Sequence, residues 1–104
     1  MKNKDIAALF NEIADILELR GENVFRINAY RRGAQTVEAL ARAIEDVASE
    51  DALDELPGIG KDLAAKIAEY IESGEIRYLK ELREGTPAIL LDMLRIPGVG
   101  PKTA

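Results

Sequence analysis

Two short glycine-containing segments have the residue types needed to bind an anion through the backbone. The first, residues 56–60, reads Leu-Pro-Gly-Ile-Gly; its proline prevents helix continuation, and Gly58 and Gly60 permit backbone angles closed to other residues. Ile59 is expected to enter the core. From Lys61 onward, apolar residues recur at helical spacing, so a helix is predicted to begin there. The first amides of that helix have no partner within it and face the turn. The segment therefore predicts a seat for a phosphate, and the alternative is a purely structural corner.

The same pattern returns near the end of the chain. Residues 96–100 read Ile-Pro-Gly-Val-Gly, at an offset of 40 positions from the first segment. Gly98, Gly100 and the following Lys102 are therefore the matching candidate contacts to a phosphate backbone. This second copy is incomplete at Ala104, so the natural protein is expected to continue.

Side chains that suit nucleic acid gather between residues 20 and 33. Four arginines fall within this stretch and are opposed only by Glu22: Arg20, Arg26, Arg31 and Arg32. Arg26 and Tyr30 share a helical stripe, and this combination suits nucleic acid because rings stack on bases and guanidinium groups clamp phosphates. The alternative is that Phe25 and Tyr30 belong to the core while the arginines cover the surface.

The composition narrows the classes of function. The 104 residues carry a net charge of −5, and residues 45–55 are acidic without a cation, so any DNA contact is expected to be local. Cysteine and histidine are absent from the sequence, which excludes disulfides, the usual zinc sites and histidine acid–base chemistry. With no long apolar run and no signal peptide, we expect a cytoplasmic protein without membrane contact.

Hydrophobic periodicity predicts an all-α fold, since no segment alternates apolar and polar residues. The expected helices are 6–17, 24–43, 51–56, 61–73, 76–82 and 88–94, and residues 45–50 are expected to form an acidic connection. Asn3 is the expected cap of the first helix, and Gly21 and Gly74 are expected stops. We expect one domain at 1–84 with a hairpin at 53–67, followed by a linker and an incomplete second hairpin at 85–104.

Taken as a set, these features resemble the N-terminal region of a family X DNA polymerase. The likeness is carried by Phe-Arg-Ile-Asn-Ala-Tyr-Arg-Arg-Gly-Ala at 25–34, the turn at 56–60, Lys66-Ile67, Gly74 and Ile-Pro-Gly-Val-Gly-Pro at 96–101. The chain looks similar to the lyase domain of DNA polymerase beta and of its bacterial and archaeal relatives. The resemblance implies a compact four-helix, helix–hairpin–helix domain. It also implies a monomer that binds gapped or nicked DNA through the backbone and 5′-phosphate in base excision repair.

The resemblance also implies roles for individual residues. Arg26, Tyr30 and Arg31 would line the 5′-phosphate pocket, and Phe25 would stack on a template base. Gly58, Ile59, Gly60 and Lys61 would contact the DNA backbone, without reading base identity. A sodium or potassium ion shared with the DNA would be held by main-chain carbonyls, those of Asp54, Leu56 and Ile59 and, in the second hairpin, Leu94, Ile96 and Val99.

Lys66 stands where the family's lyase members keep the lysine that attacks a sugar aldehyde and forms a Schiff base. The attacking lysine must be neutral, whereas Asp62 lies four residues earlier, a spacing that favours an ion pair. Asp62 also replaces a phosphate-binding lysine of the family, and Asp54 and Tyr78 replace two others. Lys61, one position before Asp62, compensates in part for the lost phosphate-binding lysine.

Three interpretations stay open. The first is a DNA-binding module, the second adds 5′-deoxyribose-phosphate lyase activity through Lys66, and the third is a small helical protein-interaction module. Nucleotidyl transfer needs clustered carboxylates that hold two magnesium ions, and the acidic residues here are expected on helix surfaces. Polymerase chemistry, with its Mg²⁺, is therefore expected outside this chain, and no cofactor is expected within it.

Overall fold

The computed structural model describes residues 2–87, and these residues form helices joined by short turns. The elements are α1 (Asn3–Leu19), α2 (Val24–Ala39), α3 (Ile44–Ser49), the 3-10 helix η1 (Leu53–Glu55), α4 (Lys61–Ser73) and α5 (Arg77–Glu84). No strand occurs within this range, and the all-α prediction is confirmed. The helix expected at 88–94 and the second hairpin, with Leu94, Ile96, Gly98, Val99, Gly100 and Lys102, lie outside the described residues.

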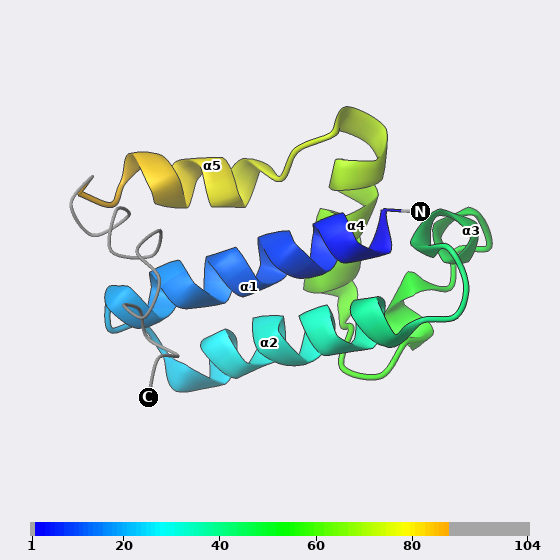
Figure 1. The fold of residues 1–104 in the computed structure, drawn as a ribbon, viewed down its shortest axis with the longest axis horizontal. Coiled ribbons are helices and arrows are strands. Elements are labelled where there is room, and N and C mark those ends of the chain that lie inside the picture. Colours follow the sequence, from blue (N-terminus) through cyan, green and yellow to red (C-terminus); the bar gives the residue numbers. More distant parts are fainter. Residues whose placement is uncertain (1, 88–104) are drawn as a thin grey trace.

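Helix α1 is the centre of the fold. It packs antiparallel along α2, and α5 runs along another side of it (Figure 1). Ile6, Phe10, Ile13 and Leu17 recur at helical spacing and form one buried stripe. Ala14 and Ile16 are buried beside it, so α1 can be covered by two neighbours. Residues 2–87 contain five α-helices and the 3-10 helix η1, one α-helix more than the four-helix domain that the resemblance implies.

Helix α2 is shorter than the sequence predicts, and an unexpected helix follows it. The prediction of a helix to residue 43 is wrong, because α2 ends at Ala39 and Leu40 has an extended backbone with ψ 135°. The prediction of an acidic connection at 45–50 is also wrong, since Ile44–Ser49 forms α3.

Asn3 stabilises the corner between α2 and α3. It is the first residue of α1 rather than its cap, and its side chain is buried. Its amide nitrogen donates to the carbonyl of Arg42 at 2.7 Å and to that of Val37 at 3.4 Å. Its amide oxygen accepts from the N–H of Ile44, the first residue of α3, at 2.9 Å. These bonds satisfy the N–H at the start of α3 and a carbonyl of the connection between α2 and α3.

Other helix ends follow local signals. Gly21 and Gly74 have φ angles of 71° and 83°, and both confirm the predicted stops. The side chain of Asn23 caps α2 by accepting from the N–H of Phe25 at 2.7 Å. The short helix expected at 51–56 is the 3-10 turn η1.

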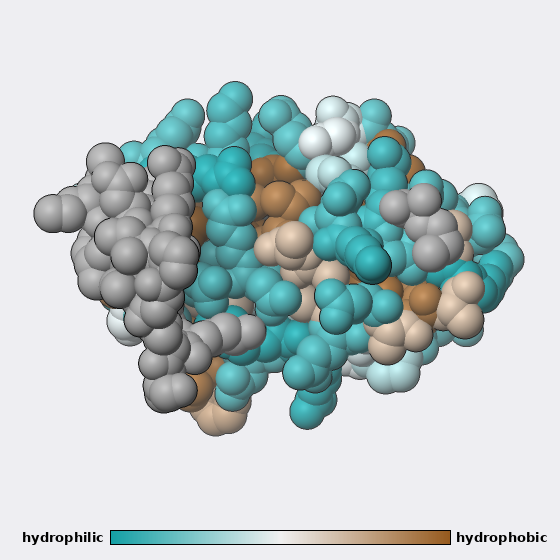
Figure 2. All heavy atoms as spheres, viewed as in Figure 1, coloured by the Kyte–Doolittle hydropathy of each residue, from teal (hydrophilic) through white to brown (hydrophobic). Residues whose placement is uncertain are grey.

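The exposed side chains of residues 2–87 are mainly polar. Figure 2 shows a largely hydrophilic face, with apolar side chains visible between the elements. Val24 and Phe25, at the start of α2, are large apolar side chains that lie exposed. No helix among residues 2–87 has the length and apolar character that crossing a bilayer requires.

Candidate nucleic-acid interface

Residues 56–61 form the exposed turn between η1 and α4, which we call the hairpin turn. Gly58, Gly60 and Lys61 are exposed, whereas Ile59 is buried, as the sequence predicts. The N–H of Ile59 donates to the carbonyl of Leu56 at 3.0 Å and closes the turn. No residue in the range 2–87 accepts a hydrogen bond from the amides of Gly58, Gly60 or Lys61. The hairpin turn therefore presents backbone donors at the positive end of α4.

Helix α2 holds the hairpin turn in place. The hydroxyl of Thr36 donates to the carbonyl of Pro57 at 2.7 Å. Gly58 has a φ of 77°, which favours glycine, and a Cβ there would lie 2.5 Å from Cδ of Arg32, so the arginine side chain would have to shift. Gly33 lets α2 approach α4, since a Cβ there would lie 2.9 Å from a leucine methyl group of α4.

A hollow lies between α2 and the hairpin turn. Its lining residues are Phe25, Asn28, Ala29, Arg32 and Gly58. Phe25 is 79% exposed, which contradicts the interpretation that it belongs to the core. Among the described ion pairs of residues 2–87, none involves Arg32. The hollow thus combines an exposed ring and a cation beside the backbone donors, a combination that suits a nucleic-acid strand.

A second group of side chains, which we call the tyrosine cluster, consists of Arg26, Tyr30, Asp62, Lys66 and Tyr78. The ring of Tyr30 is stacked on that of Tyr78, with 6.2 Å between centroids and 17° between planes. The guanidinium carbon of Arg26 lies 5.1 Å, and Nζ of Lys66 5.0 Å, from the centroid of Tyr78. The cluster therefore joins α2, α4 and α5 around two rings, with two cations close to the ring of Tyr78.

Tyr30 is a core residue with an unsatisfied polar end. It is 1% exposed, and its hydroxyl has no hydrogen-bond partner in the described part of the chain. Burial raises the pKa of Tyr30, and the charge of Asp62 raises it further, while Arg26 opposes the shift. The hydroxyl therefore keeps its proton at neutral pH and remains a donor.

Lys66 is already paired. Its Nζ lies 2.8 Å from Oδ1 of Asp62, one turn earlier on α4, which confirms the ion pair expected from the spacing. The Lys66 side chain is 14% exposed and the Asp62 side chain 73% exposed. The structure thus brings Lys66 together with Arg26 and Tyr30, and places a carboxylate at the outer side of the group.

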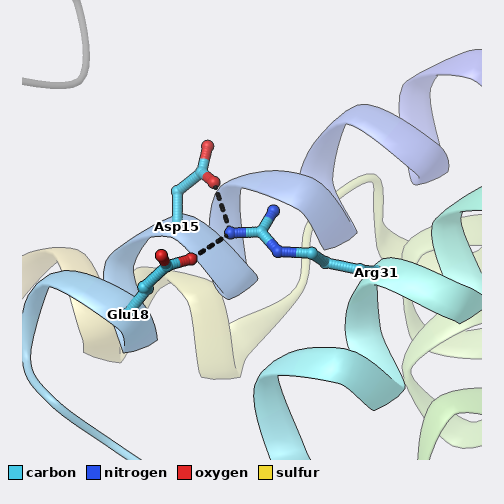
Figure 3. A network of polar contacts seen from close by, with 3 residues as sticks. All are labelled: Asp15, Glu18 and Arg31. Atoms are coloured by element: carbon cyan, nitrogen blue, oxygen red, sulfur yellow. Dashed lines mark hydrogen bonds and ion pairs between the residues drawn. The ribbon is translucent and has the colours of Figure 1, made fainter. Parts of the chain in front are cut away.

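Arg31 is held away from the tyrosine cluster by α1. Its Nη2 lies 3.0 Å from Oδ1 of Asp15 and 2.6 Å from Oε1 of Glu18, and Figure 3 shows the guanidinium pointing toward both carboxylates. Its Nη1 is buried without a partner in the described residues. This geometry makes Arg31 a link between α1 and α2, and its expected role in the phosphate pocket stays a prediction.

The predicted cation ligands are carbonyls of η1 and the hairpin turn. Of the carbonyls of Asp54, Leu56 and Ile59, that of Leu56 already accepts the N–H of Ile59. A carbonyl oxygen has a second lone pair, so this bond is compatible with an ion. Within residues 2–87, no group of three or more acidic side chains is placed to hold a metal ion.

The sequence reasoning missed two contributors to these surfaces. Tyr78 was recognised only as a replaced lysine, although its ring lies beside both cations of the tyrosine cluster. Arg32 was one arginine among four, and its position against Gly58 depends on the packing of α2 on the hairpin turn. No local signal marks either role, because both depend on neighbours that are distant in the sequence.

Comparisons with known proteins agree with the fold. Residues 1–76 match a family described as a helix-hairpin-helix domain. The chain is 36% identical over 102 residues to a DNA polymerase/3′-5′ exonuclease PolX from Bacillus subtilis, covering 98% of this chain and 17% of that protein. It is 29% identical over 103 residues to DNA polymerase lambda from Arabidopsis thaliana, covering 98% of this chain and 19% of the relative. It is 34% identical over 71 residues to DNA polymerase lambda from Rattus norvegicus, covering 68% of this chain and 12% of that protein.

The chain thus spans less than a fifth of the length of these relatives, at 17%, 19% and 12%. The resemblance to family X DNA polymerases that the sequence analysis identified is confirmed.

Proposed function

The chain belongs to the helix-hairpin-helix domain family, and we propose that it binds the sugar–phosphate backbone of DNA and recognises a gap through its 5′-phosphate. The observation that carries this proposal is the hairpin turn, where the exposed amides of Gly58, Gly60 and Lys61 have no acceptor among residues 2–87. Amides at a helix start bind phosphate oxygens and read no base. That the relatives are DNA polymerases supports a DNA ligand.

The tyrosine cluster is the proposed binding site of the 5′-phosphate. Arg26 and Lys66 supply the charge, and the hydroxyl of Tyr30 lies among them as a donor. Lys66 follows Lys61 by five residues of α4, about 7.5 Å along the helix axis and about 140° around it, so a DNA end that contacts both the hairpin turn and the cluster would have to pass around the first turns of α4. Phe25 offers an exposed ring on which a base at the gap would stack.

A salt titration with defined DNA tests the proposal. Binding is measured to a duplex with a one-nucleotide gap, carrying either a 5′-phosphate or a 5′-hydroxyl. We expect the phosphate to strengthen binding, and we expect affinity to fall with salt along a shallow slope, since few contacts to phosphates are expected. Equal affinity for the two duplexes would contradict phosphate recognition, and affinity independent of salt would contradict binding to the backbone.

A sodium or potassium ion bound by the carbonyls of Asp54, Leu56 and Ile59 would add a contact between the hairpin turn and a phosphate. Replacing potassium chloride by tetramethylammonium chloride at equal ionic strength removes cations that can enter such a site. We expect weaker DNA binding after this exchange. Unchanged affinity would remove the ion from the proposal and leave the amides as the contact.

The partial burial of Lys66 favours a second function, a 5′-deoxyribose-phosphate lyase. In this reaction Nζ would attack the sugar aldehyde and, with loss of water, form a Schiff base. The ion pair with Asp62 opposes this role because Nζ is already engaged with a carboxylate. Borohydride trapping on an incised abasic site decides the question, since a true intermediate gives a covalent adduct that Lys66→Ala abolishes.

A further inference from the structure

The tyrosine cluster contains a carboxylate where an anionic ligand would sit. Asp62 pairs with Lys66 at 2.8 Å, yet the two side chains differ in exposure, 73% for Asp62 against 14% for Lys66. Lys66 lies close to the ring of Tyr78 and is largely enclosed. Asp62 can turn into solvent without losing packing, so the ion pair can open by movement of the carboxylate alone.

The remaining groups of the cluster are donors. The hydroxyl of Tyr30 is buried and has no acceptor in the described residues, an arrangement that costs free energy unless a partner arrives. Arg26 lies close to Tyr78, and none of the ion pairs described for residues 2–87 involves it. The cations of Arg26 and Lys66 and the hydroxyl of Tyr30 therefore lie around Tyr78. Asp62 neutralises part of this positive charge.

We propose that Asp62 is an internal competitor for the phosphate, because its carboxylate occupies the side of Lys66 that a DNA 5′-phosphate needs and is expelled when the phosphate binds. This inference rests on the proposed function, which it deepens by naming the residue that sets the phosphate dependence. When the phosphate binds, Lys66 exchanges one anion for another, so the 5′-phosphate increases the affinity for DNA by less than it would without Asp62. Asp62 loses little on release, because most of it is already hydrated.

The test compares three forms of the full 104-residue chain: wild type, Asp62→Asn and Glu72→Gln. Glu72 is an exposed acid on the same helix and takes part in none of the ion pairs described for residues 2–87, so its replacement controls for the change in net charge. Each form is titrated with the gapped duplex carrying a 5′-phosphate or a 5′-hydroxyl, over a range of salt concentrations. Circular dichroism verifies that each form is folded.

We expect Asp62→Asn to bind the phosphorylated gap about fivefold more tightly than wild type, the size of one exposed ion pair, and the hydroxyl gap with little change. Its salt slope on the phosphorylated gap should steepen by about one unit, because Lys66 then releases a counterion. Glu72→Gln should follow wild type on both duplexes. In wild type, the carboxyl carbon resonance of Asp62 should shift with the phosphorylated duplex and stay unchanged with the hydroxyl duplex.

The outcomes separate this inference from the proposed function. If wild type prefers the phosphorylated gap while folded Asp62→Asn binds it no more tightly, the competitor role is overturned and phosphate recognition stands. A gain of equal size in Glu72→Gln would also overturn it, since net charge would then explain the effect. If no form distinguishes the two duplexes, phosphate recognition fails and the competitor role fails with it.

Discussion

The hairpin turn and the tyrosine cluster both adjoin helix α4, yet they present opposite kinds of binding surface. The hairpin turn offers amides whose direction is set by the backbone, and no group among residues 2–87 accepts from Gly58, Gly60 or Lys61. The cluster offers side-chain charge, of which Lys66 is already paired with Asp62. An acidic chain can thus keep a surface for phosphate in its backbone while a carboxylate pairs with a cation of its side-chain surface.

Two arginines of α2 show the same contrast. Arg31 is bound to Asp15 and Glu18 of α1, whereas Arg26 lies close to the ring of Tyr78 without a carboxylate partner among the described ion pairs of residues 2–87. Five residues apart, one arginine contributes to stability and the other is available to a ligand. Counting charges along the sequence therefore does not locate the binding surface, and each prediction below tests one side of this contrast.

The largest expected effect is that of Gly58→Ala. An alanine at a φ of 77° costs about 1–2 kcal/mol, and the collision of its Cβ with the side chain of Arg32 adds to this cost. Gly21→Ala is the matched control, since Gly21 has a φ of 71° and open space around it. Urea unfolding should show a larger loss for Gly58→Ala, and DNA binding should weaken only there. Equal losses of stability and affinity in both variants would contradict a special role for the hairpin turn.

Arg31→Ala should reduce the free energy of unfolding by about 1–2 kcal/mol, because two carboxylates of α1 lose their shared partner. Arg26→Ala should change stability by less than about 0.5 kcal/mol, as expected for an exposed side chain, and should weaken binding to the phosphorylated gap. Chemical denaturation and DNA titration of both variants measure this contrast. If Arg31→Ala instead lowers affinity at unchanged stability, Arg31 belongs to the phosphate pocket after all.

Thr36→Val should cost about 1 kcal/mol, because the carbonyl of Pro57 loses the hydroxyl that binds it at 2.7 Å. The variant should also weaken DNA binding modestly, since the hairpin turn loses its hydrogen bond to α2. Thr36→Ser keeps the hydroxyl and should behave as wild type in both urea unfolding and DNA titration. A Thr36→Ser variant as impaired as Thr36→Val would show that the methyl group, and not the hydrogen bond, positions the turn.

Tyr30→Phe should leave stability at neutral pH unchanged or raise it slightly, because the buried hydroxyl has no partner among residues 2–87 to lose and its lack of one costs free energy. Above the usual pKa of 10.0 the unfolded wild type loses the phenol proton while the folded state keeps it, so wild-type stability should fall as pH rises. This fall should be shallower in Tyr30→Phe, and urea unfolding at pH 9 and pH 11 measures the difference. Parallel pH profiles of the two proteins would contradict the raised pKa of Tyr30.

Much of the fold follows from local signals. The stops at Gly21 and Gly74, the buried Ile59 and the exposed glycines of the hairpin turn were all predicted, because each depends on backbone angles or periodicity within a few residues. The end of α2 and the presence of α3 were not predicted. They depend on Asn3, whose side chain bonds to Ile44 across 41 positions, a distance over which no local pattern acts.

For the candidate interface, the sequence by itself determined where the backbone turns, that Lys66 faces Asp62 one turn away, and that the chain resembles family X polymerases. Proline, glycine and the helical repeat act on adjacent residues, so these features need no knowledge of the fold. Only the tertiary structure decided which charges are cancelled and which rings are buried. Arg31 meets carboxylates 16 and 13 residues away, and Tyr30 meets Tyr78 of a distant helix, because packing of α1, α2 and α5 chooses those partners.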